Sequence, residues 1–96
     1  NFQLFVTVKG QVKEETGFVM DLKVLSDIIK GEVIEHLDHK NLNLDVPFLK
    51  GKMASTENII KVIWERLEAP IAKHDATLHS LKLTETENNF VEYYGE

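Results

Sequence analysis

The spacing of the apolar residues changes along the chain, and this constrains the fold more than any other feature. Side chains alternate from Phe2 to Val8, so that Leu4 and Val6 share one face, as in a half-buried strand. Between Leu22 and Leu37 the apolar residues instead recur at helical spacing. Asp21 can cap this stretch by accepting hydrogen bonds from its first free amides. The sequence therefore predicts a strand followed by an amphipathic helix.

A second helix follows a linker over residues 38–54, which is too long to be a simple connection and is of the kind that usually carries function. Ser55 and Thr56 can cap this helix, and we expect Pro70 to close it. Its apolar residues share one side: Ile59, Ile60, Ile63, Trp64 and Leu67.

The last part of the chain has the pattern of a hairpin. Leu81 and Leu83 alternate with polar residues, and a turn at 87–89 leads into the stretch 90–94. A short extended piece is also expected at 18–20, after a polar turn. The order strand, helix, helix, strand, strand predicts a single α+β domain over residues 1–96, with an antiparallel sheet and both helices on one face.

Composition excludes several classes of function. The chain of 96 residues has a net charge of -5 and no basic stripe, which argues against nucleic acid as a partner. It has no apolar run near the ~20 residues that cross a bilayer, so no membrane segment is expected. It also has no cysteine, which excludes a thiolate zinc site and fits a reducing, cytoplasmic setting. The strand pattern begins directly at Asn1 without a leader, so we expect the N-terminus to be incomplete.

Glu85 is the most informative charged residue. It lies two and four positions after Leu83 and Leu81, and alternate residues of a strand share one face. Its carboxylate should therefore point to the core side at the end of its strand. The strand could instead end before Glu85 and leave the side chain in solvent. The functional interpretation is ligand recognition, because a carboxylate offers two adjacent acceptors to a ring edge with two N–H donors, such as that of a pterin or guanine.

Two further pairs could carry chemistry. Asp38 can orient the imidazole of His39 or raise its pKa toward working pH, although both residues could equally be surface or capping groups. Thr56 and Glu57 open the second helix, where amides and hydroxyls can bind a polar or anionic ligand, although capping also explains them. No recognisable metal-ligand spacing connects the histidines His36, His39, His74 and His79.

Several blocks of the sequence closely resemble the 6-pyruvoyl-tetrahydropterin synthase family, which includes the bacterial 6-carboxy-tetrahydropterin synthases. The most specific block is Leu-Asp-His-Lys-Asn-Leu-Asn at 37–43. The resemblance runs from Asn1 to Glu96, and its other blocks are 17–22, 45–48, 55–58 and 85–89, with Glu92, Tyr93 and Gly95.

The resemblance implies a tunnelling fold, in which subunits with two helices and four strands join their sheets into a barrel, typically a hexamer made of two trimers. The implied substrate is 7,8-dihydroneopterin triphosphate. In the family, zinc held by three histidines polarises the substrate side chain, and a cysteine acts with an Asp and a His that match Asp38 and His39. Family residues that contact the pterin match Glu85 and Thr56.

The chain also departs from the family pattern. The cysteine and the zinc histidines precede the position of Asn1 in the family and do not occur here, so we expect the 96 residues alone not to be a complete catalyst. Three interpretations stay open: a pyruvoyl synthase of tetrahydrobiopterin synthesis, a carboxy synthase of queuosine synthesis, and a pterin-binding or oligomeric relic without catalysis. The turn at 87–89 favours the pyruvoyl branch on resemblance alone.

Overall fold

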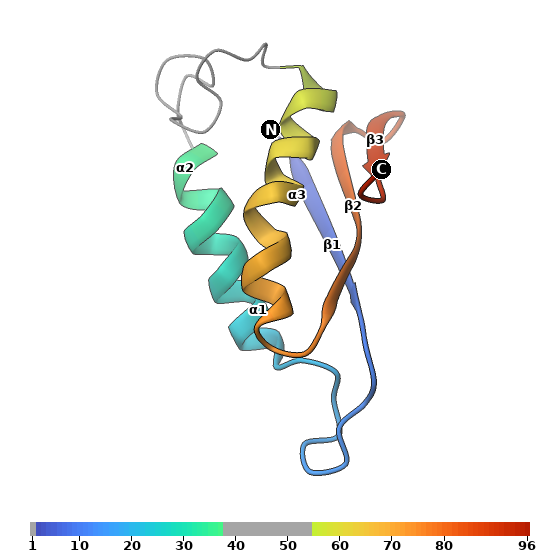
Figure 1. Cartoon of the computed structure of the whole chain (residues 1–96). Coiled ribbons are helices and arrows are strands. Elements are labelled where there is room, and N and C mark those ends of the chain that lie inside the picture. Colours follow the sequence, from blue (N-terminus) through green and yellow to red (C-terminus); the bar gives the residue numbers. More distant parts are fainter. Residues whose placement is uncertain (1, 38–54) are drawn as a thin grey trace.

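A computed structural model of the chain describes residues 2–37 and 55–96 (Figure 1). The elements, in chain order, are strand β1 (Gln3–Lys9), helices α1 (Leu22–Ile29), η1 (Lys30–Ile34), α2 (Glu35–Leu37) and α3 (Thr56–Ala72), and strands β2 (Thr77–Thr86) and β3 (Asn89–Tyr93). α1, η1 and α2 follow one another without a break and form the first of two long helical segments, and α3 is the second.

The strands form one antiparallel sheet in the order β1-β2-β3. In β1, Leu4, Val6 and Val8 are half-buried while their neighbours are exposed, which confirms the predicted alternation. The α+β class with two helical segments on one side of the sheet is also confirmed (Figure 1). The resemblance implies four strands, whereas the described residues form three. The short piece expected at 18–20 is a series of bends rather than a strand, and Met20 is buried there.

The hydrophobic core lies between α3 and the sheet. Ile63 and Leu67 on α3 and Leu81 on β2 are at most 1% exposed. α1 and η1 add Leu25 and Val33 to the same cluster. The opposite face of the sheet has no helix over it and carries exposed aromatic rings, so the sheet is covered on one side only within the described residues.

The first helical segment contains a wide turn that the sequence did not predict. Asp21 caps α1 as expected, its carboxylate accepting from the Lys23 amide at 2.8 Å. In η1, however, the Glu35 amide bonds the Lys30 carbonyl, which is the i→i+5 pattern of a π-helix. The side chain of Arg66 on α3 reaches this turn, where it donates to the Glu32 carbonyl at 3.1 Å and pairs with the Glu32 carboxylate at 2.9 Å. Two contacts from α3 thus hold the wide turn against the second helix.

α3 runs past Pro70, so the expectation that Pro70 closes the helix is wrong. A proline lacks the N–H that would bond the carbonyl four residues earlier, which weakens the helix but does not stop its last turn. Ile71, directly after Pro70, is fully buried and anchors that turn in the core. Within the described residues no helix is both long and apolar enough to cross a membrane.

The C-terminal residues pack on α3 through Trp64. The ring of Tyr93 meets the Trp64 ring edge-on at 5.5 Å between centroids, and the Tyr93 hydroxyl donates to the Glu96 carbonyl at 2.6 Å. Gly95 adopts φ +84°, and a Cβ placed on it would lie 2.6 Å from the Trp64 ring. Only a glycine fits this backbone against this ring.

We therefore expect Gly95→Ala to lower the free energy of unfolding by ~1–3 kcal/mol, because the added methyl is both overpacked and in a left-handed backbone. Urea unfolding followed by tryptophan fluorescence, at a fixed protein concentration, would measure the loss. Gly31→Ala is the matched control, since a Cβ at Gly31 has no atom within 4 Å. A Gly95→Ala protein as stable as the parent would show that the end of the chain does not pack on Trp64.

Candidate functional site

The N-terminus of α3 and the end of β2 meet through a hydrogen bond between two side chains. Ser55 is the residue that caps the helix, and its hydroxyl accepts from the Asn58 amide at 3.2 Å. The Thr56 hydroxyl is not used for capping and donates to Oε1 of Glu85 at 2.8 Å. The capping expected of Ser55 is thereby confirmed, whereas Thr56 holds the carboxylate of a residue 29 positions away.

This contact borders a hollow of about 290 Å³, which we call the Glu85 hollow. Its lining residues are Thr56, Glu57, Glu85, Asn88, Asn89, Phe90 and Val91. Glu85 is exposed, so its carboxylate is accessible to a ligand. The structure thus brings together the three residues that the sequence singled out for substrate binding: Thr56, Glu57 and Glu85.

Glu85 occupies a β-bulge. The ladder between β2 and β3 pairs Thr84 with Phe90 and Thr86 with Asn89, so Glu85 is an extra residue without a partner on β3. β2 continues to Thr86, so the strand does not end before Glu85, although the Glu85 side chain is exposed, as that alternative expected. The bond to Thr56 places the carboxylate on the helix side of the sheet, as its parity predicts. A bulge re-aims a side chain, and here it accompanies a carboxylate that faces a helix N-terminus.

The charge of the Glu85 hollow selects the kind of ligand it can take. Two carboxylates, those of Glu57 and Glu85, line it, and the lining residues that the structure describes include no lysine, arginine or histidine. The N-terminus of α3 partly offsets this negative charge. These two carboxylates therefore suit a neutral or cationic group that donates hydrogen bonds. One Glu85 oxygen already accepts from Thr56, but a carboxylate has about four acceptor sites, so two ring N–H groups can still be bound.

The hairpin turn supplies lining residues that were not assigned from the sequence. Asn88 belongs to the turn, and Asn89, Phe90 and Val91 begin β3, which starts one residue earlier than the stretch 90–94 expected from the sequence. The predicted turn at 87–89 carried a signal for them, because a tight turn directly after Glu85 must lie at the same end of the sheet.

Asp38 and His39 lie outside the described residues, so their predicted role stays a prediction. α2 ends at Leu37, directly before them. His36 lies on α2 with its Nε2 3.4 Å from a terminal nitrogen of Arg66. In the described ranges 2–37 and 55–96, no three side chains of histidine, aspartate or glutamate are grouped so as to hold a metal ion.

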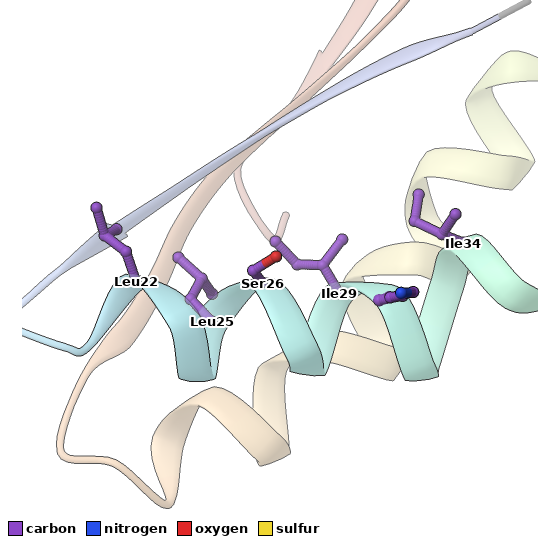
Figure 2. Close-up of a pocket in the computed structure, with 6 residues that line it drawn as sticks. Leu22, Leu25, Ser26, Ile29 and Ile34 are labelled. Carbon is purple, nitrogen blue, oxygen red and sulfur yellow. The ribbon is translucent and has the colours of Figure 1, made fainter.

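A second and larger hollow, of about 420 Å³, runs along α1 and η1. Figure 2 shows Leu22, Leu25, Ser26, Ile29 and Ile34 along this side of the helix. The described residues that line it are mostly apolar, with Lys30 as their charged member, and they include no pair of acid–base groups. We therefore place the candidate site in the smaller Glu85 hollow, where polar groups converge.

Known proteins with a related sequence are named as pterin enzymes. A protein named 6-pyruvoyl tetrahydrobiopterin synthase from Dictyostelium discoideum is 46% identical over 96 residues, covering 100% of this chain and 69% of its own length. The protein of the same name from Homo sapiens is 38% identical, with 100% of this chain and 65% of its own length covered. This chain thus spans about two thirds of the length of these relatives.

The fold agrees as well. The solved structure of Caenorhabditis elegans 6-pyruvoyl tetrahydropterin synthase superposes with a TM-score of 0.88 at 29% identity, covering 100% of this chain and 67% of that chain. The sequence profile described as 6-pyruvoyl tetrahydropterin synthase matches residues 1–96. The chain therefore belongs to the 6-pyruvoyl tetrahydropterin synthase family.

Proposed function

We propose that this chain is the pterin-binding part of a lyase that converts 7,8-dihydroneopterin triphosphate to 6-pyruvoyl-tetrahydropterin with loss of triphosphate. The observation that carries the proposal is the Glu85 carboxylate, held by the Thr56 hydroxyl at 2.8 Å and open to a hollow. The family and the names of the relatives supply the reaction.

In this proposal Glu85 anchors the ring and does not transfer protons. The two oxygens accept from the adjacent N–H groups of the amino-pyrimidinone edge, which a planar carboxylate matches in spacing. Thr56 fixes the orientation of the carboxylate before the ligand arrives, and this lowers the entropy lost on binding. Glu57 lines the same hollow and adds an acceptor for a polar group of the ring.

Asp38 and His39 are the proposed proton-transfer pair. An imidazole beside a carboxylate can take and return a proton near neutral pH, and the reaction must move protons on the substrate side chain while triphosphate leaves. The described residues that line the Glu85 hollow include two carboxylates, so we expect the triphosphate to extend away from Glu57 and Glu85.

Zinc stays a prediction from the family resemblance. The described residues do not fit a site of three histidines, because they contain no suitable group of three ligands. The chemistry proposed for this chain therefore includes no step through the metal. A cytoplasmic setting is likewise a proposal, based on the lack of cysteine.

The names of the relatives favour the pyruvoyl product over the carboxy product of queuosine synthesis. The relatives from Dictyostelium discoideum and Homo sapiens are both named as pyruvoyl synthases. A relic that binds pterin without converting it is the non-catalytic alternative, and the experiments below separate it from the enzyme.

Glu85→Gln should weaken pterin binding by ~1–3 kcal/mol, or roughly 5- to 150-fold in Kd, because the amide presents an N–H to a ring donor. Calorimetric titration with neopterin would measure the change. Glu87→Gln is the matched control, since Glu87 stands two residues away and is not among the residues that line the hollow. Equal affinity of the parent and Glu85→Gln would remove Glu85 from ligand recognition.

His39→Ala in the natural protein that contains this chain should reduce turnover by at least about 100-fold while neopterin affinity stays within about twofold, because proton transfer is lost and ring anchoring is not. Asp38→Asn should lower the rate as well. Product formation would be followed by chromatography of the pterins. Near-normal rates in both variants would exclude the pair from the mechanism, and lack of turnover in the parent protein would support the relic.

The assembly proposed is a homo-oligomer, typically a hexamer, in which sheets join into a barrel. β1 and β3 are the edges of the described sheet, and open edges on a small domain are expected to pair with another copy. Light scattering of the natural protein at micromolar concentration should give a mass several times that of one chain. A stable monomer would contradict this assembly.

A further inference from the structure

The hairpin turn next to Glu85 affects the position of the Glu85 carboxylate. We propose that Asn89 is a positioning residue for the Glu85 carboxylate, because it holds the bulged end of β2 through its bond to Thr86. This inference rests on the proposed function of Glu85 as the ring anchor. Asn89 also lines the Glu85 hollow, whereas Thr86 is not among the lining residues, so a change at Thr86 separates positioning from direct contact with the ligand.

The turn has an unfavourable geometry for a two-residue hairpin. β2 ends at Thr86 and β3 begins at Asn89, so Glu87 and Asn88 form the whole loop. Loops of this length favour turns with positive φ, whose twist matches that of the strands. Among the described non-glycine residues, however, only Asp75 has a positive φ. Glu87 and Asn88 therefore form a turn that tends to splay the two strands.

Two features next to the turn compensate for this tendency. The bulge at Glu85 increases the local twist, and the pairing of β2 with β3 resumes after it at Thr86 and Asn89. The side-chain amide of Asn89 then donates to the Thr86 hydroxyl at 3.1 Å and ties the two strands together at the turn. Both residues are the last pair of the ladder, so their bond closes the hairpin beyond the bulge.

The position of Glu85 depends on this closure. Glu85 has no partner on β3, so its backbone is held on that side by the pairs before and after it, Thr84 with Phe90 and Thr86 with Asn89. If the second pair opens, the bulge loses one of its two supports, and Glu85 can rotate away from Thr56. Two ring hydrogen bonds require the carboxylate to stay within a few tenths of an ångström, so a loosened bulge weakens binding without altering the carboxylate itself.

The first test removes the bond from either side. Asn89→Ala and Thr86→Val should each weaken neopterin binding, measured by calorimetry, about 5- to 30-fold. Thr86→Ser keeps the hydroxyl and should bind within about twofold of the parent. If Asn89→Ala and Thr86→Val bind like the parent while Glu85→Gln is weakened, the positioning role is wrong and the proposed function stands. If Glu85→Gln also binds like the parent, the proposed function itself fails.

A second variant separates positioning from stability. Replacing Glu87 and Asn88 together, Glu87→Asn with Asn88→Gly, introduces the pair of residues that forms the favoured turn with positive φ. This hairpin should no longer need the bulge. Its thermal unfolding should therefore occur at the same or a higher temperature than that of the parent. Its neopterin affinity should nevertheless fall below that of the control Asn88→Ala. Affinity equal to that of Asn88→Ala would overturn the proposal.

Discussion

The packing of α3 on β2 is the constraint on which both the core and the site depend. Ile63 and Leu67 on the helix and Leu81 on the strand are each at most 1% exposed. Burying a side chain of this size contributes about 1.5–3 kcal/mol, so this interface is the main source of stability in a small domain. It also fixes the N-terminus of α3 relative to the far end of β2. The bond between Thr56 and Glu85 forms where these two elements, held in place by the core, extend beyond it.

The elements themselves could be predicted because they follow from the spacing of apolar residues. The alternation around Val6 and the helical spacing around Ile63 are set by which faces must be buried, and a single sequence records that requirement. The caps at Asp21 and Ser55 are local as well, since each side chain bonds an amide two or three residues away. The convergence of Thr56 and Glu85 depends on the fold, but the family resemblance already pointed to both residues.

The deviations from regular structure could not be predicted because each depends on a partner distant in the sequence. The wide turn in η1 is held by Arg66, which lies 34 residues after Glu32. Pro70 does not end α3, because the buried side chain of Ile71 holds the following turn in the core. The bulge at Glu85 exists only in relation to the register of β3. Local propensity carries no information about these contacts, so the boundaries and irregularities were the parts predicted wrongly or missed.

The Glu85 hollow is open to solvent, and this limits the affinity that its hydrogen bonds alone can provide. Glu85 is exposed, and hydrogen bonds that water can replace contribute little net free energy. A planar ring that fills the hollow would displace water from the carboxylate as it binds, whereas the Phe90 ring lies on the other face of the sheet, 4.4 Å from the Lys82 ammonium. The value of each hydrogen bond then rises as the local dielectric falls. Recognition in this hollow therefore depends on the flat apolar surface of the ligand as much as on its N–H groups, and a small hydrogen-bond donor without a ring would gain little from the same carboxylate.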